Sequence, residues 1–297
     1  MLSLPELKYF SYKNGRLAYR EAGVGPTLFL LHGMNGGSQS WAHLFQSLAT
    51  SFRIVAWDAP GFGESDVFGD SVEDFKDAAL ALMDSLKLNN AILIGHSMGG
   101  VVALQLAIDQ EASVSGLILS STHLGFNCPK GSALMPRYAN RIERMTSNGV
   151  DIAYGRERAK GSTPPETSEA VIDFLAKIAA GSRVEGIRNG GRMSQEANNA
   201  EICADVKVPV LILSGEKDTV IPSNMHSDLL EALPEAQQYV FPDAGHATLA
   251  VGLAGHAEAG AGHPGDRQAV QDRPGSTRHR GKRHPDHARQ RRAAGSR

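Results

Sequence analysis

The stretch Gly95-His96-Ser97-Met98-Gly99-Gly100 decides the fold of this 297-residue chain. An apolar run at residues 91–94 precedes it, and a helix-like apolar run at 101–108 follows it. A serine between two glycines in a strand–turn–helix context is typical of a nucleophile elbow. Such a turn holds the serine in strained backbone, so its neighbours must be small. We therefore expect Ser97 Oγ to stand just beyond the end of a strand, at the start of a helix.

Length and composition exclude several classes of protein. The chain is 41% hydrophobic with a formal net charge of −2, which suits a globular protein and gives no sign of nucleic-acid binding. Its two cysteines, Cys128 and Cys203, do not suggest a disulfide framework. No apolar run approaches the roughly 18 residues of a membrane span, and the N-terminus does not resemble a signal peptide. We expect a cytoplasmic enzyme that acts on a small molecule, with neither nucleic acid nor membrane as its partner, in an oligomeric state that the sequence leaves open.

Apolar runs separated by helix-like segments continue along the chain. The Asn14-Gly15 pair between two alternating runs predicts an antiparallel β-hairpin. Unbroken apolar runs are typical of strands buried on both faces. Because such runs alternate with helical spacing, we expect βαβ units and a mostly parallel sheet of eight strands. The strands expected after the hairpin lie at 27–31, 52–57, 91–94, 116–120, 208–213 and 238–241.

One long insertion interrupts this alternation. No strand-like run occurs between about residues 124 and 204. A long excursion at the active-site end of a sheet is usually a cap or lid. We therefore expect a core made of residues 1–123 and 205–250, and a helical lid at 124–204. The helices expected within the lid lie at 133–147, 167–180 and 185–199.

Three loops that follow predicted strands carry the residue types of nucleophilic catalysis. A serine hydroxyl needs an adjacent base, and the base needs a third group that fixes its tautomer and stabilises its cation. Ser97, Asp218 and His246 each follow a strand, where α/β folds place ligands. The loop Ser120-Ser121-Thr122-His123 contains no carboxylate, which favours Asp218 as the acid. Glu216 is the nearest alternative to it.

Other polar residues near these loops have simpler interpretations. We expect His32 to brace its own loop through hydrogen bonds. His96 directly precedes the serine, so its side chain should point away from that of Ser97. Asp58 is interpreted as a turn former, because the loop after it is rich in turn residues.

The same chemistry needs donors for an oxyanion and a pocket for the substrate. The donors are backbone amides, for which we expect Met98, the residue after the serine, and Met34, which follows His32-Gly33. We expect Trp41, His123 and Val220 to line the pocket, although Trp41 would also suit the core. No metal or organic cofactor is needed.

Together these motifs resemble those of the α/β-hydrolase superfamily over roughly residues 8–250. The resemblance implies an α/β-hydrolase fold with an N-terminal hairpin, a parallel sheet and a helical lid, and the order Ser, Asp, His is the one found on that fold. Within the superfamily, the chain looks most like small lid-bearing bacterial hydrolases such as 3-oxoadipate enol-lactonases and meta-cleavage-product hydrolases. The motifs are His32-Gly33-Met34, Asp58-Ala59-Pro60-Gly61-Phe62-Gly63-Glu64-Ser65, Gly95-His96-Ser97-Met98-Gly99-Gly100, Gly215-Glu216-Lys217-Asp218 and Gly245-His246.

The resemblance also implies a serine hydrolase that works through an acyl-enzyme. A serine at the elbow argues against haloalkane dehalogenases and epoxide hydrolases, which carry aspartate there. His96 favours an ester or lactone substrate, since meta-cleavage hydrolases more often carry asparagine at that position. Three alternatives stay open: hydrolysis of a carbon–carbon bond by the same residues, a small-molecule receptor, and a cofactor-free peroxidase or dioxygenase.

Eight arginines occur in the expected lid, and they have two interpretations. An enol-lactonase substrate carries a carboxylate, which a bidentate guanidinium would hold. A solvated helix face is the interpretation that we favour for any single arginine. The residues are Arg137, Arg141, Arg144, Arg156, Arg158, Arg183, Arg188 and Arg192.

The resemblance stops soon after His246. Proteins of this kind usually continue into a final helix that packs on the sheet, and that helix has no recognisable counterpart here. Residues 252–297 hold ten Lys and Arg against four Asp and Glu, and they lack Ile, Phe, Tyr, Trp and Met. Such a segment cannot bury enough apolar surface to offset its ordering entropy. We interpret 251–297 as an out-of-frame translation of a GC-rich gene, with a disordered basic tail as the alternative.

Overall fold

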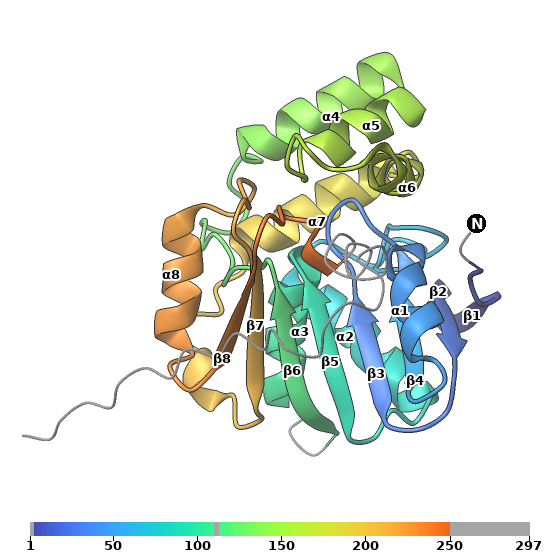
Figure 1. The fold of residues 1–297 in the computed structure, drawn as a ribbon, viewed down its shortest axis with the longest axis vertical. Coiled ribbons are helices and arrows are strands. Elements are labelled where there is room, and N and C mark those ends of the chain that lie inside the picture. Colours follow the sequence, from blue (N-terminus) through green and yellow to red (C-terminus); the bar gives the residue numbers. More distant parts are fainter. Residues whose placement is uncertain (1–2, 110–112, 250–297) are drawn as a thin grey trace, which may run out of the picture. The chain divides into compact units, whose positions relative to one another are not determined.

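A computed structural model describes residues 3–109 and 113–249 of the chain. Their strands form one eight-stranded sheet in the order β1-β2-β4-β3-β5-β6-β7-β8 (Figure 1). From β4 to β8 all neighbouring strands are parallel. The carboxyl ends of these strands therefore meet along one edge of the sheet, and the loops that follow them are brought together there.

The N-terminal hairpin forms one end of the sheet. β1 (Leu7–Tyr12) and β2 (Gly15–Ala22) pair in antiparallel fashion, with Tyr12 opposite Gly15. β2 also pairs antiparallel with β4, with Tyr19 opposite Trp57. The hairpin predicted from Asn14-Gly15 is thus confirmed.

The central parallel strands are short and largely buried, as their unbroken apolar runs predicted, whereas the edge strand β8 has no buried residue. All five residues of β3 are buried, and four of the five in β4. Successive side chains along each strand point to opposite faces of the sheet, so each face needs a cover of helices. The bounds are β3 Thr27–Leu31, β4 Arg53–Trp57, β5 Ala91–His96, β6 Val114–Ser120, β7 Val210–Gly215 and β8 Gln237–Phe241.

Helices cover the sheet on both faces. α1 (Ala42–Leu48), which follows a short 3₁₀ turn at Ser38–Trp41, packs against Leu28, Leu30 and Ile54. Residues of the other face, including Phe29 and Leu93, belong to a larger core with the remaining sheet helices. Those helices are α2 (Val72–Ser85), α3 (Met98–Asp109) and α8 (Ser223–Ala232).

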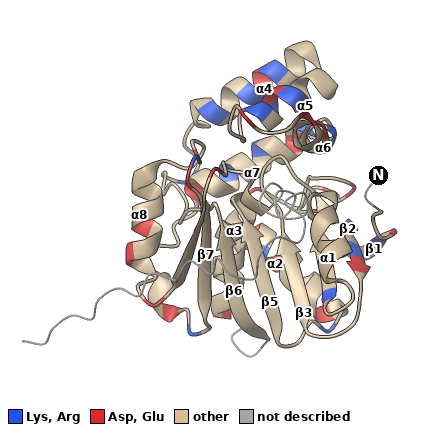
Figure 2. Cartoon of the chain, viewed as in Figure 1, with Lys and Arg blue, Asp and Glu red and all other residues tan. Residues whose placement is uncertain are grey.

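Four further helices lie between β6 and β7 in the sequence, beyond the carboxyl ends of the strands (Figure 1). We call α4–α7 the helical insertion. A Cβ at Gly190 of α7 would lie 2.8 Å from Met98 Sδ, so α7 rests directly on the start of α3. Basic side chains are frequent on α4 and α5, whereas the strands are largely uncharged (Figure 2). The bounds are α4 Pro136–Asn148, α5 Ile152–Lys160, α6 Glu169–Ala179 and α7 Val184–Glu196.

α5 is the one helix of the insertion that the sequence did not predict. Gly155 lies in its middle, and glycine weakens a helix prediction because it lowers helix propensity by about 1 kcal/mol. In the structure, a Cβ at Gly155 would lie 2.1 Å from the carbonyl oxygen of Ala176 in α6. The glycine is therefore used for close packing of two helices, a reason that local sequence patterns do not reveal.

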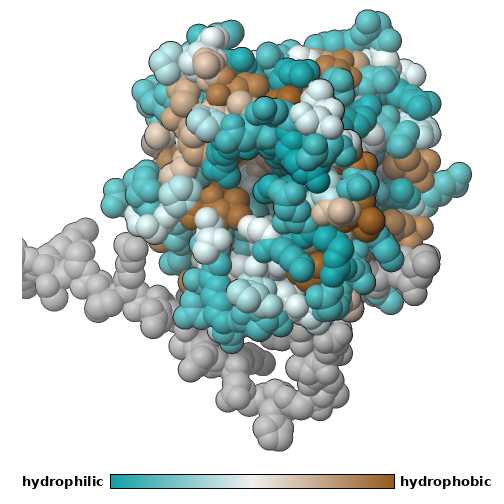
Figure 3. All heavy atoms as spheres, turned by 90° about the horizontal axis from the view of Figure 1, so that it is seen from above, coloured by the Kyte–Doolittle hydropathy of each residue, from teal (hydrophilic) through white to brown (hydrophobic). Residues whose placement is uncertain are grey.

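The proposed C-terminal tail lies outside the described residues, which end at Leu249. Within residues 3–109 and 113–249, no helix is long and apolar enough to cross a membrane. Viewed from the side of the helical insertion, the surface is mostly hydrophilic, with scattered hydrophobic patches (Figure 3).

Candidate active site

The turn between β5 and α3 holds Ser97 in the strained backbone that its flanking glycines predicted. Ser97 has a φ of 51°, in the left-handed region. Its amide donates a hydrogen bond of 2.9 Å to the carbonyl of Ser120, and its carbonyl accepts one of 2.6 Å from Thr122 Oγ1. A Cβ at Gly99 would lie 2.1 Å from the Leu31 carbonyl oxygen, so no larger residue fits there without a shift.

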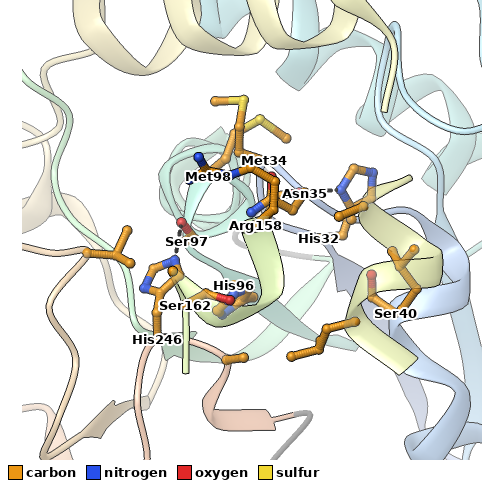
Figure 4. Close-up of a pocket in the computed structure, with 18 of the residues that line it drawn as sticks. His32, Met34, Asn35, Ser40, His96, Ser97, Met98, Arg158, Ser162 and His246 are labelled. Atoms are coloured by element: carbon orange, nitrogen blue, oxygen red, sulfur yellow. Dashed lines mark hydrogen bonds between the residues drawn. The ribbon is translucent and has the colours of Figure 1, made fainter. Parts of the chain in front are cut away.

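Ser97, His246 and Asp218 form a continuous chain of hydrogen bonds. His246 Nε2 lies 3.0 Å from Ser97 Oγ (Figure 4), and His246 Nδ1 lies 3.0 Å from Asp218 Oδ2. Ser97 follows β5, Asp218 follows β7, and His246 follows β8. All three side chains are almost fully buried. The structure thus brings together the three residues that the sequence singled out from separate loops.

The surroundings of Asp218 favour its charged form. Burial would raise the pKa of this carboxyl, but the hydrogen bond and charge of His246 and two backbone amides hold its pKa below the usual value. The amides of Val220 and Ile221 donate to Asp218 Oδ1 over 2.8 and 3.2 Å. Val220 lines the cavity, as expected. Its amide also helps to hold Asp218 in place, a backbone role that the type of side chain does not predict.

His96 does not point away from the site, so that expectation is wrong. Its ring centroid lies 5.0 Å from that of His246. Side chains alternate only along a regular strand, and the left-handed turn at Ser97 ends that regularity. Burial, reinforced by the neighbouring His246, lowers the pKa of His96 to about 3, so its imidazole is neutral.

The loop after β3 lies against Ser97. A Cβ at Gly33 would lie 3.1 Å from Ser97 Cβ. Met34, the next residue, and Met98 both line the cavity above the serine (Figure 4). Among the described residues, the backbone hydrogen bonds of turns, loops and helix caps include none that the Met34 or Met98 amide donates. Both amides are thus available as donors.

His32 braces this loop, as the sequence predicted. The Ala59 amide donates to His32 Nε2 over 2.9 Å, so Nε2 carries no proton. Nδ1 therefore carries the proton and donates to the Gly33 carbonyl over 2.8 Å. Asp58 stabilises the neighbouring turn by accepting from the amides of Ser38 and Glu64 over 2.5 and 3.0 Å, which confirms its role as a turn former.

A cavity of about 500 Å³ opens above Ser97 and is lined by both the sheet loops and the helical insertion. Trp41, His123 and Val220 all line it, and Trp41 is 3% exposed. Burial and the nearby Arg137 lower the pKa of His123 to about 3, and its Nδ1 accepts from the Gly125 amide over 2.9 Å. His123 is therefore a neutral part of the wall.

Arginines of the insertion divide into two groups. Arg137, Arg141 and Arg158 line the cavity. Arg137 is exposed, which agrees with the solvated helix face favoured from the sequence, but Arg141 and Arg158 are half-buried, so that interpretation is wrong for them. Arg156 does fit that interpretation, because it pairs with Glu169 and Asp173 at the surface. Helical periodicity could not distinguish the two groups, because the packing of α4 and α5 against the core decides which side faces the cavity.

The helical insertion is also tied to the loop that carries His246. The Ala247 amide donates to the Ser162 carbonyl over 3.2 Å. Lys217 Nζ forms ion pairs with Glu166 of the insertion and with Asp243, the latter at 2.8 Å. No sequence pattern pointed to these contacts, which join residues 26 to 85 positions apart.

Among the described residues, no three His, Cys, Asp or Glu side chains are grouped so that they could hold a metal ion. Cys203 is buried and Cys128 is half-buried, and neither forms a disulfide. Burial raises the pKa of the Cys203 thiol to about 11.

Several of the known proteins to which this chain is similar are hydrolases. The family model described as serine aminopeptidase, S33, matches residues 24–250. The pimeloyl-[acyl-carrier protein] methyl ester esterase of Pectobacterium carotovorum subsp. carotovorum is 29% identical over 237 residues, which cover 78% of this chain and 91% of the relative. The 2-hydroxy-6-oxononadienedioate/2-hydroxy-6-oxononatrienedioate hydrolase of a Pseudomonas species is 24% identical over 262 residues, which cover 78% and 86%.

Two further comparisons bear on extent and fold. The dihydrolipoyllysine-residue acetyltransferase component of the acetoin cleaving system of Cupriavidus necator is 28% identical over 236 residues, but this chain spans only 60% of its length. An esterase structure from Thermogutta terrifontis superposes with a TM-score of 0.73 at 23% identity, over 86% of this chain and 96% of the esterase. These likenesses confirm the predicted α/β-hydrolase fold.

Proposed function

Because this chain belongs to the serine aminopeptidase S33 family of α/β-hydrolases, we propose that it is a serine hydrolase that cleaves small carboxylic esters or lactones through an acyl-enzyme. The observation that carries this proposal is the hydrogen-bonded chain from Ser97 through His246 to Asp218 beneath a cavity of about 500 Å³. A cavity of this size suits a small molecule.

Acylation uses the serine as the nucleophile. His246 Nε2 accepts the Ser97 hydroxyl proton while Oγ attacks the substrate carbonyl carbon. The Met34 and Met98 amides donate to the resulting oxyanion. The tetrahedral intermediate then breaks its bond to the alkoxy oxygen, which takes the proton from His246. In a lactone, the released hydroxyl stays attached to the acyl group.

Deacylation reverses the roles of these groups. His246 takes a proton from water, the water oxygen attacks the acyl carbon, and the proton passes to Ser97 Oγ as the ester bond breaks. The Asp218 carboxylate holds His246 in the required tautomer and stabilises its cation. The depressed pKa of Asp218 supports this role, because it keeps the carboxyl charged.

The curated relatives support the substrate class in different degrees. The 29% identical esterase acts on a methyl ester, as its name states. The 24% identical Pseudomonas hydrolase supports a second candidate, hydrolysis of a carbon–carbon bond in a ring-fission product. Both reactions would use the same three residues, so the substrate must be distinguished by assay.

The proposal is tested by three substrates offered to the same enzyme: an aryl acetate, a five-membered lactone and a ring-fission dienoate. We expect hydrolysis of the ester and the lactone, and loss of both activities in Ser97→Ala. Asp218→Asn should lower kcat by about 10³- to 10⁴-fold, because the amide favours the wrong histidine tautomer. Turnover of the dienoate alone would establish the second candidate, and wild-type activity in Ser97→Ala would refute both.

A further inference from the structure

Polar atoms without hydrogen-bond partners are concentrated around the cavity. Within the described residues, eight buried side-chain nitrogen or oxygen atoms lack a partner. Six of these eight belong to residues that line the cavity above Ser97. A buried polar group without a partner costs about 1–3 kcal/mol. Their concentration in one place therefore points to a ligand that supplies the missing partners.

Of the six unpartnered atoms in residues that line the cavity, three can only donate. They are Trp41 Nε1, Arg141 Nη2 and Arg158 Nε. Arg141 Nε is already used, since it donates to Tyr154 OH over 2.6 Å. The ligand that these donors require is an acceptor, and two of the three donors belong to positively charged groups.

The charge of the cavity agrees with this requirement. No Asp or Glu is found among the described residues that line it, whereas three arginines are. Arg141 has no carboxylate partner within salt-bridge distance in the described part of the chain, and the nearest to Arg158 is the exposed Glu157, 3.8 Å away. Burial of Arg141 lowers its pKa from the usual value, with a further contribution from the nearby Arg158, so the two guanidinium groups lie close enough to interact.

These donors line the same cavity as the nucleophile Ser97. Arg141 projects from α4 and Arg158 from α5, so both come from the helical insertion. Figure 4 shows Arg158 in the same space as Ser97, Met34 and Asn35. A substrate whose carbonyl lies at Ser97 would therefore extend towards the arginines with its other end.

We propose that the substrate carries a free carboxylate, which Arg141 and Arg158 bind while the scissile ester or lactone carbonyl lies at Ser97. The substrate class is thus the monoester of a dicarboxylic acid, or a lactone with a carboxylate side chain. Guanidinium groups suit this ligand, because they form charge-assisted, often bidentate hydrogen bonds with carboxylates. This inference rests on the proposed function.

A matched pair of substrates tests it. One is the 4-nitrophenyl monoester of adipic acid, and the other is the same ester with its carboxylate replaced by a carboxamide. We expect kcat/KM to be about 10- to 100-fold higher for the acid, because a hydrogen bond between charged groups contributes roughly 1.5–3 kcal/mol. The difference should lie mainly in KM, since the carboxylate is remote from the reacting carbonyl.

Substitutions assign the preference to the two arginines. Arg141→Gln and Arg158→Gln should each lower kcat/KM for the acid ester about 10-fold or more and change that for the amide ester less than about 2-fold. The rate with the amide ester also reports whether each variant is folded. The matched control is Arg156→Gln on the same helix, whose side chain pairs with Glu169 and Asp173 outside the cavity. It should leave both rates unchanged.

The outcomes separate this inference from the proposed function. Equal rates for the two esters, or an acid preference that persists in both variants, would overturn the carboxylate site while leaving the hydrolase intact. If neither ester is cleaved, the binding of adipate to the Ser97→Ala protein is measured by calorimetry. Binding that Arg158→Gln weakens about 10-fold or more would still support the carboxylate site, and no binding would refute it.

Discussion

At the level of single residues, the proposed chemistry depends strongly on the backbone amide of Met34. A backbone role of this kind cannot be recognised from the type of side chain. It follows Gly33, whose backbone lies against Ser97. Among the described residues, no backbone hydrogen bond of a turn, loop or helix cap is donated by this amide. A donor held ready in this way is worth most when negative charge develops next to it in the transition state.

A substitution that removes only this N–H tests its role. Met34→Pro should lower kcat on an aryl ester by about 100- to 1000-fold, the loss typical of one oxyanion donor. Met34→Ala is the control, because it shortens the side chain and keeps the N–H, and it should retain activity within about 5-fold of wild type. Stopped-flow or steady-state release of the phenolate measures both, and similar losses in the two variants would contradict the assignment.

Single residues differed in how far the sequence could predict them. Ser97, Asp218 and His246 were predictable because each follows a strand, and parallel strands bring their carboxyl ends together. His96 was misplaced because its direction depends on the turn at Ser97 rather than on strand alternation. Arg141 and Arg158 could not be distinguished from the other arginines, since only tertiary packing decides which of them faces the cavity.

Among the elements, α5 shows how packing overrides local pattern. Its central Gly155 argues against a helix, yet the absence of a side chain there lets α5 lie directly on α6. α5 in turn carries Arg158, one of the proposed carboxylate ligands. The other helices and strands were predicted within a few residues because their apolar residues follow a clear period.

A larger residue at Gly155 should separate the two helices. In Gly155→Val, the new side chain would meet the Ala176 carbonyl of α6, so we expect the free energy of unfolding to fall by about 1–3 kcal/mol. Ala153→Val, on the exposed side of the same helix, controls for placing a β-branched side chain in this helix without the contact to α6. Urea unfolding measures both, and equal stabilities would show that close packing at Gly155 is unimportant.

At the scale of the whole molecule, the order of apolar runs was enough to predict a mostly parallel sheet with an inserted helical segment. The strand order, by contrast, follows from which crossovers pack best, and the sequence did not reveal it. Which titratable side chains are buried also could not be predicted from the sequence. His96 and His123 are both buried, with pKa values of about 3.

These two histidines make the stability of the fold depend on pH. Their pKa values are lowered on folding, so the unfolded chain binds more protons below its usual histidine pKa of 6.5. Their favourable contribution is complete above pH 6.5 and is lost as the pH falls towards 3. Each should add about 1.4 kcal/mol per pH unit to the decline between pH 6 and 4.

Urea unfolding of wild type and His96→Asn at several pH values measures this contribution. The variant lacks one titrating group, so its free energy of unfolding should fall less steeply, by about 1.4 kcal/mol per pH unit. Histidines that do not interact with His96 affect both proteins equally and cancel in the comparison. Parallel pH profiles would mean that folding does not lower the pKa of His96.

The reactivity of Ser97 is the central claim, and covalent labelling tests it most directly. The folded protein is treated with a fluorophosphonate, digested, and analysed by mass spectrometry. The account predicts one phosphonyl adduct, on Ser97, that forms far more slowly in Asp218→Asn and is absent in Ser97→Ala. A folded wild-type protein whose Ser97 stays unmodified, or one that is labelled elsewhere, would contradict it.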